Sequence, residues 1–178
     1  MYFSLPKEYR EASTDELKER IRAAKARLGK KLVILAHHYQ RVEIVEFGDY
    51  LGDSYALSKI AAQQQEAEYI VFCGVHFMAE SADILTDELK TVYLPNPLAG
   101  CPMADMAEMA DVLAAWDYLG EIGNRDKVVP ISYMNTTAGL KAFTGRNGGL
   151  ICTSSNAESA MKWEIGRASC RERVYCEV

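Results

Sequence analysis

The sequence predicts an α/β protein with parallel sheets. Short apolar runs that suit buried strands, residues 32–36, 69–73 and 150–152, alternate with longer stretches whose apolar residues recur at helical spacing. Hydrophobic residues make up 49% and charged residues 25% of the 178 residues, which excludes a disordered, collagen-like or coiled-coil chain. We therefore expect one three-layer α/β unit followed by the start of a second, similar unit.

The first half of the chain supplies a helix and then alternating strands and helices. Ser13 and Glu16 form a capping-box pattern that opens a helix, and Gly29 ends it. The remaining elements expected in this half are the strand 32–36, helical stretches near 42–50 and 54–65, the strand 69–73, a helix over 78–85 and the strand 91–94.

The second half continues the alternation. Pro102 suits the first position of a helix, so a long helix is expected over 102–118. The later elements are a strand over 127–133 with Pro130 at an edge or bulge, a helix over 137–143, a turn at 145–149, the strand 150–152 and a helix over 156–163. Glycines cluster in 118–126, so we place the first unit at 1–118 and an incomplete second unit at 126–163.

The C-terminal segment differs from the rest of the chain. Residues 164–174 follow neither the helical nor the strand period, and together with 175–178 they hold Cys170 and Cys176. Residues 164–174 resemble an in-frame translation of a common sequencing-library adapter, and such segments are set aside before the fold is considered. We expect 164–178 to be a foreign tail on a truncated piece of a longer protein. An ordinary polar C-terminal helix is the alternative.

Charge and hydropathy exclude several classes of function. Twenty basic and 25 acidic residues give a net charge of −5, with no basic run of four, so we expect no nucleic-acid or membrane partner. No apolar stretch approaches the length of a bilayer span, and the N-terminus lacks the apolar core of a signal peptide. We therefore expect a cytoplasmic protein. Five cysteines without a Cys-x-x-Cys pair favour free or metal-bound thiols over disulfides.

Reactive side chains follow the predicted strands. In open parallel sheets, ligands bind beyond the carboxyl ends of the strands. The segments at those ends are residues 37–40 (HHYQ), 74–76 (GVH), 100–101 (GC), 133–135 (YMN) and 153–156 (TSSN). This concentration favours an enzyme over a scaffold protein.

His37 and Tyr39 form the first candidate pair. They lie two residues apart on a segment expected to be extended, so they should point the same way and His38 the opposite way. A histidine beside a phenol can share proton transfer and orient a carboxylate or carbonyl group. A histidine satisfied by the backbone at a strand end is the alternative interpretation.

Two serines and a cysteine are further candidates. Ser54 and Ser154 lie at expected helix openings, where hydroxyl and backbone N–H groups suit an anion, although plain helix capping explains the same residues. Cys101 lies at an expected helix start, whose dipole would favour the thiolate that a metal ligand or nucleophile needs. Cys73 and Cys152 are expected to be structural thiols.

These motifs together resemble the quinolinate synthase family. The matching segments are residues 35–40 (LAHHYQ), 52–54 (GDS), 71–80 (VFCGVHFMAE), 100–104 (GCPMA), 133–135 (YMN) and 151–157 (ICTSSNA). The resemblance runs from about residue 32 to residue 163. It implies an enzyme that condenses iminosuccinate with dihydroxyacetone phosphate to form quinolinate, the pyridine precursor of NAD. It also implies three similar α/β units in a pseudo-threefold arrangement around a 4Fe–4S cluster.

The resemblance also implies a role for individual residues. Cys101 would be one of three cluster ligands, which leaves one iron open as a Lewis acid, and the other two ligands are missing from this chain. Tyr39 would assist proton transfer. Iminosuccinate would contact His37, Ser54, Tyr133, the backbone at Met134, Asn135 and Ser154. We expect the chain alone to be inactive and its parent to work beside an enzyme that supplies iminosuccinate.

Two other classes of function remain open from the residues alone. A metal-free α/β module that binds a small dicarboxylate or phosphate would need the serines but not Cys101. A thiol enzyme would use Cys101 as its nucleophile and would need a base within hydrogen-bond reach. Two further cysteines downstream in the full reading frame would favour the cluster.

Overall fold

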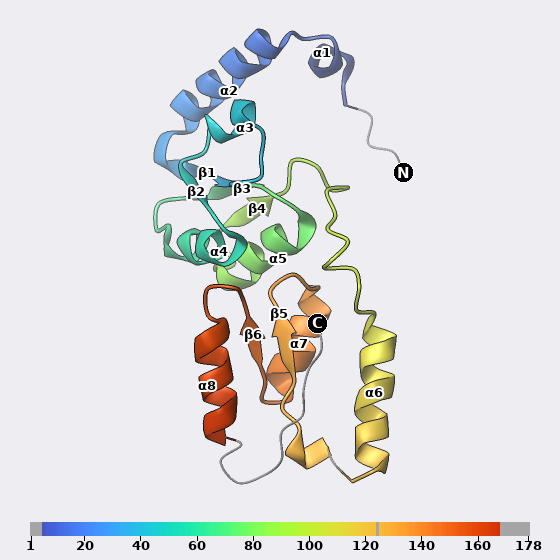
Figure 1. The fold of residues 1–178 in the computed structure, drawn as a ribbon. Coiled ribbons are helices and arrows are strands. Elements are labelled where there is room, and N and C mark those ends of the chain that lie inside the picture. Colours follow the sequence, from blue (N-terminus) through green and yellow to red (C-terminus); the bar gives the residue numbers. More distant parts are fainter. Residues whose placement is uncertain (1–4, 124, 168–178) are drawn as a thin grey trace. The chain divides into compact units, whose positions relative to one another are not determined.

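The computed structural model describes residues 5–123 and 125–167, with side chains described up to residue 163. It divides into two compact units. The first holds the residues up to Gly74 together with Ala82–Pro95, and the second holds Val75–Ser81 and the residues from Asn96 onward. Each unit contains its own parallel sheet (Figure 1), so the predicted α/β class is confirmed. Among the described residues, no helix is long and apolar enough to cross a membrane.

The first unit is built on a four-stranded parallel sheet. Its strands are β1 (Leu32–His37), β2 (Tyr50–Gly52), β3 (Tyr69–Cys73) and β4 (Thr91–Tyr93), in the order β2-β1-β3-β4. The central strand β1 is the most buried, and Leu35 and Ala36 on it have no exposed surface. Burial on both faces explains why this strand is a continuous apolar run.

The edge strand β2 was not predicted. Residues 42–50 were expected to be helical, but only α3 (Val42–Val45) is a helix. The Asp49 carboxylate accepts the Ile34 N–H at 2.8 Å, and the Asp49 N–H donates to the Ile34 carbonyl at 2.7 Å. These bonds draw the chain against β1, and the next residues then pair with it, so that Gly52 lies opposite His37.

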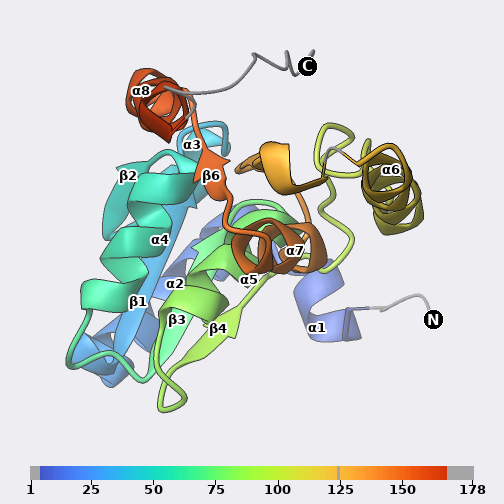
Figure 2. The same ribbon diagram turned by 90° about the horizontal axis from the view of Figure 1, so that it is seen from below.

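Helices cover the sheet of the first unit. After α1 (Lys7–Arg10), α2 (Thr14–Leu28) begins as predicted, with the Ser13 hydroxyl accepting the Glu16 N–H at 3.2 Å, and a 3₁₀ turn, η1 (Gly29–Lys31), follows it. Gly29 ends α2 with φ +53°, a conformation that favours glycine. The helix α4 (Ser54–Gln63) runs alongside β1 and β2 (Figure 2). The helix α5 (His76–Leu85) begins in the second unit and ends in the first.

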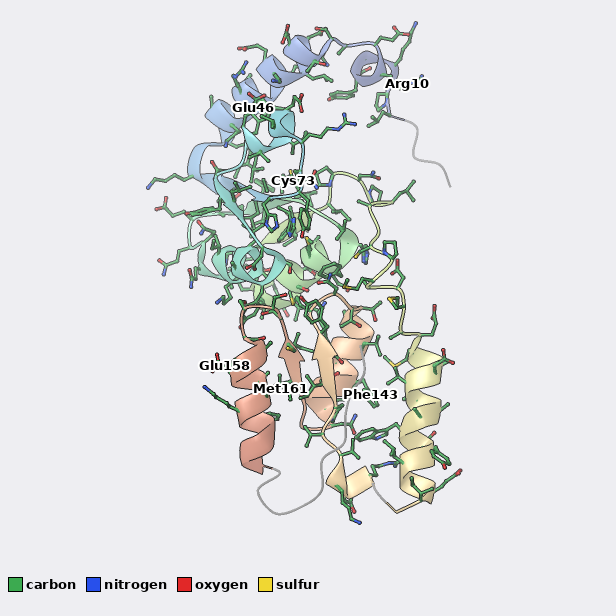
Figure 3. The ribbon with its side chains drawn as sticks, viewed as in Figure 1. Arg10, Glu46, Cys73, Phe143, Glu158 and Met161 are labelled. Carbon is green, nitrogen blue, oxygen red and sulfur yellow. The ribbon has the colours of Figure 1, made fainter. Side chains whose placement is uncertain are left out.

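The second unit contains a parallel pair of short strands, β5 (Ile131–Tyr133) and β6 (Leu150–Cys152), joined by α7 (Ala138–Arg146). It also contains the start of α5, α6 (Met109–Glu121), the 3₁₀ turn η2 (Arg125–Lys127) and α8 (Ala157–Arg167). Phe143 of α7 (Figure 3) packs edge-on against Trp116 of α6, with ring centroids 5.4 Å apart. The register places Tyr133 opposite Cys152, so both strands end at the same edge.

The helix predicted over 102–118 begins later than expected. The Cys101 carbonyl accepts the Ala104 N–H at 2.8 Å, which closes a turn, and α6 starts only at Met109. Met103 and Met106 in this segment are exposed. Cys101 therefore lies in a turn, and the prediction that a helix dipole favours its thiolate is wrong.

The boundary between the two compact units differs from the predicted boundary. They separate after Pro95, and α6 lies with β5 and β6 in the second unit. The predicted ranges 1–118 and 126–163 refer to repeating units of a larger architecture and stay a prediction. The helix α8 continues to Arg167, and the rest of the predicted tail, with Cys170 and Cys176, lies outside the described residues. The foreign origin of 164–178 also stays a prediction.

Candidate functional site

A turn at the carboxyl end of β1 brings three rings together. The Gln40 N–H donates to the His37 carbonyl at 2.9 Å, which closes the turn over His38 and Tyr39. The His37 and His38 rings stack with centroids 4.3 Å apart, and the Tyr39 ring lies 4.6 Å from the first and 4.4 Å from the second. The expectation that His38 points away is wrong because the extended segment ends at His37.

His37 is held with its proton on Nε2. The Tyr39 N–H donates to His37 Nδ1 at 3.3 Å, so Nδ1 acts as the acceptor of the neutral ring. Burial lowers the pKa of His37, the charge of His38 lowers it further, and Asp53 opposes both effects. Within the described chain, no group hydrogen-bonds Nε2. The Nε2–H is therefore the donor that His37 can offer to a ligand.

Tyr39 and Ser54 lie at the same edge of the sheet. The Tyr39 side chain is 82% exposed. The start of α4 is capped by Asp53, whose carboxylate accepts the Ala56 N–H at 2.8 Å. Ser54 is therefore not the capping residue, and its hydroxyl forms no hydrogen bond with any other described residue. Because Gly52 pairs opposite His37, this hydroxyl and the His37 ring belong to one edge.

The second unit carries the other predicted substrate contacts. The Tyr133 hydroxyl and the Ser154 Oγ lie 2.6 Å apart, and both side chains are exposed. Met134 is buried, its N–H donates to the Cys152 carbonyl at 2.7 Å, and its own carbonyl accepts the Thr136 N–H at 2.9 Å. The backbone of Met134 is thus already engaged, and a ligand would meet only the second lone pair of its carbonyl.

Side chains fix the loops that carry Asn135 and Ser154. The Asn135 amide donates to the Met103 Sδ at 3.5 Å, and a thioether is a weak acceptor that a ligand oxygen would replace. Buried Thr153 donates its N–H to Asn156 Oδ1 at 2.5 Å and shares a 2.8 Å hydrogen bond with the Ser155 hydroxyl. These bonds fix the loop while the Ser154 side chain stays exposed.

The described cysteines do not form a metal site. Cys73, Cys101 and Cys152 are all free and half-buried. Burial raises the pKa of the Cys73 thiol, and the Cys152 thiol donates to the Thr153 carbonyl at 3.6 Å, as structural thiols do. Within residues 5–123 and 125–163, no group of three His, Cys, Asp or Glu side chains is placed to hold a metal ion.

The fold and these residues define an α/β protein with polar groups at the carboxyl ends of its parallel strands. The first unit presents a histidine–phenol pair, and the second unit presents two hydroxyls and an amide, groups that can each hydrogen-bond a carboxylate. Comparison with known sequences is more specific. The family model described as "Quinolinate synthetase A protein" matches residues 19–171, and the chain belongs to this quinolinate synthase family.

Curated relatives agree with this assignment. A quinolinate synthase of Nocardioides sp. is 59% identical over 152 residues, which cover 85% of this chain and 39% of the relative. A quinolinate synthase of Streptomyces coelicolor is 58% identical over 151 residues, covering 85% of this chain and 38% of the relative. One from Corynebacterium glutamicum is 52% identical over 163 residues, covering 92% and 41%. The chain therefore spans about two-fifths of the length of these relatives.

Proposed function

We propose that the whole protein containing this chain condenses iminosuccinate with dihydroxyacetone phosphate to form quinolinate for NAD biosynthesis, in the cytoplasm. The observation that carries this proposal is the 52–59% identity with proteins named quinolinate synthase. The family match also spans every predicted site residue, from His37 to Ser154.

His37 and Ser54 are proposed to bind one carboxylate of iminosuccinate. The neutral His37 ring donates its Nε2–H, and the Ser54 hydroxyl donates a second hydrogen bond. The lowered pKa of His37 keeps the ring neutral near pH 7, so that Nδ1 retains its bond from Tyr39. Tyr39 is proposed as the catalytic residue, because its exposed phenol lies against both imidazoles and can pass a proton to or from a bound ligand.

The second unit is proposed to contact the same substrate through three side chains and one backbone group. The paired hydroxyls of Tyr133 and Ser154 can each turn a proton toward a carboxylate oxygen. The Asn135 amide exchanges its weak sulfur acceptor for the same kind of oxygen. The Met134 backbone has the smallest part in this set, because both its groups are bonded within the unit.

The proposed cofactor is a 4Fe–4S cluster with Cys101 as one ligand. Such a cluster, when held by three thiolates, supplies a Lewis-acidic iron. The described residues do not fit a complete cluster site, because they offer no group of three suitable side chains and because Cys73 and Cys152 are structural thiols. Cys101 alone is therefore assigned to the cluster, and the roles proposed above do not depend on it.

The proposal is tested with the full-length protein, purified without oxygen and supplied with iminosuccinate and dihydroxyacetone phosphate. Quinolinate is measured by chromatography, with the Streptomyces coelicolor relative assayed in parallel. We expect quinolinate from both proteins. Its formation by the relative alone would refute the proposed function.

We further propose that the 178-residue chain by itself makes no quinolinate. Of its three described cysteines, only Cys101 is assigned to a cluster that is expected to need three ligands. The same assay applied to this chain alone checks the point, and measurable quinolinate would contradict it.

A further inference from the structure

A lysine and a glutamate support the connection between β5 and α7 in the second unit. Lys141 is half-buried, and its Nζ donates to the Thr136 carbonyl at 2.7 Å. The Glu80 carboxylate accepts the Ala138 N–H, the first of α7, at 2.8 Å. Both bonds therefore end on the short segment that directly follows Asn135.

The Lys141 ammonium occupies an unfavourable place for a charge. Burial lowers the pKa of Lys141 to about 8, an effect that the charge of Glu80 only partly opposes. The ammonium also lies 5.4 Å from the centroid of the Phe77 ring, a cation–π contact that offsets part of this cost, and no ion pair to Lys141 is formed within the described residues. Since partial desolvation of a charge carries a free-energy cost, the contacts of the ammonium have to offset that cost. The directional contact among them is the hydrogen bond to the Thr136 carbonyl.

The hydrogen bond from Lys141 to Thr136 restrains the backbone next to Asn135. On one side, the Thr136 N–H donates to the Met134 carbonyl at 2.9 Å and closes a tight turn around Asn135. On the other side, the Thr136 carbonyl is held by Lys141. The Asn135 amide itself has only the weak contact with the Met103 sulfur. Its position is therefore set by its backbone neighbours.

We propose that Lys141 and Glu80 are positioning residues for the carboxylate substrate, acting through Asn135. Their hydrogen bonds restrain the backbone of residues 136–138 and thereby keep the Asn135 side-chain amide in a single position. This inference rests on the proposed function. Lys141 uses its ammonium on Thr136, so it acts through Asn135 and does not need to touch the substrate.

A double-mutant cycle in the full-length enzyme tests the proposal. Lys141→Met keeps the length of the side chain and removes its donor, so we expect the KM for iminosuccinate to rise roughly tenfold with a smaller change in kcat. In an Asn135→Ala background the same substitution should raise KM no further, because the amide to be positioned is gone. Lys141→Arg keeps a donor and should restore most of the affinity.

Two further variants test Glu80 and control for charge removal. Glu80→Gln keeps an acceptor oxygen for the Ala138 N–H and should act normally, whereas Glu80→Ala should raise KM as Lys141→Met does. Lys162→Met is the matched control, because Lys162 lies on α8 in an exposed ion pair with Glu158 at 2.5 Å. We expect it to leave KM unchanged.

The outcomes separate this inference from the proposed function. A wild-type enzyme that forms no quinolinate refutes the proposed function. An active wild type in which Asn135→Ala raises KM while Lys141→Met and Glu80→Ala do not refutes only the positioning role. The positioning role is also refuted if Lys141→Met raises KM equally in the wild-type and Asn135→Ala backgrounds. A parallel loss of kcat and thermal stability in Lys141→Met refutes it too, because either result indicates a merely structural residue.

Discussion

Replacing Tyr39 with phenylalanine removes one hydroxyl from the first unit and little else. The ring contacts with His37 and His38, at 4.6 and 4.4 Å between centroids, do not involve the hydroxyl. The bond that sets the His37 tautomer comes from the Tyr39 backbone N–H, which phenylalanine keeps. The substitution therefore isolates the proposed proton transfer from the binding role of His37.

The expected effects on stability and on turnover differ in size. The Tyr39 side chain is 82% exposed, so the free energy of unfolding should change by no more than about 0.5 kcal/mol. General acid–base catalysis by one side chain typically contributes ~10²- to 10⁴-fold. We therefore expect kcat to fall by about 10²-fold, equivalent to roughly 2.7 kcal/mol in the activation barrier.

Steady-state kinetics of the full-length enzyme measure both quantities. We expect Tyr39→Phe to lower kcat while the KM for iminosuccinate stays within about threefold of wild type. Tyr118→Phe is the control, because Tyr118 is an exposed tyrosine on α6 outside both groups of site residues. An unchanged kcat in Tyr39→Phe would make Tyr39 a packing residue and refute its catalytic role.

Three further predictions concern the cluster, the histidine and the fold. Cys101→Ser should abolish the bound iron of the anaerobically purified full-length enzyme while Cys152→Ser keeps it, because serine is a poor ligand for soft iron; equal iron loss in both would contradict the assignment. Burial lowers the pKa of His37 below its ordinary value of 6.5, so kcat/KM should stay level down to pH 6.5 and decline only below it. The folded state then binds fewer protons than the unfolded state, so stability should also fall below that pH; an acidic limb above pH 6.5 would count against this. Gly149→Ala should destabilise the protein by about 2 kcal/mol or more in chemical unfolding, because a Cβ there would overlap a backbone carbonyl, whereas Gly145→Ala, in helix α7 with open space, should be neutral or stabilising.

The sequence was sufficient for the elements whose signals are local. The Ser13 cap, Gly29 and the apolar run of β3 gave bounds close to the observed ones, because capping and strand burial are properties of a few adjacent residues. The strand β2 was missed because its pairing depends on Asp49, whose bonds reach back to Ile34. The helix predicted from Pro102 failed because a favourable first residue does not prevent the following residues from closing a turn.

The sequence predicted where the candidate site residues lie along the strands better than it predicted how their side chains are oriented. Sheet topology places His37 at the end of β1, and this edge could be predicted from the order of strands. The contact between His37 and His38 could not, because it depends on the turn that the Gln40 N–H closes. Glu80 and Lys141 gave no signal of their own, since their relation arises only when α5 and α7 pack together.

The substrate contacts proposed within this chain would bind a carboxylate without a positively charged side chain. His37 is held neutral, and the other donors are hydroxyl groups and one amide. The net charge of −5 also gives the chain no long-range attraction for an anion. Hydrogen bonds to a carboxylate contribute roughly 1.5–3 kcal/mol each only when the donor points at the oxygen. The contribution of these proposed contacts to affinity then depends on the placement of each donor, so the backbone bonds that fix the His37 tautomer and the Asn135 turn matter as much as the donors themselves.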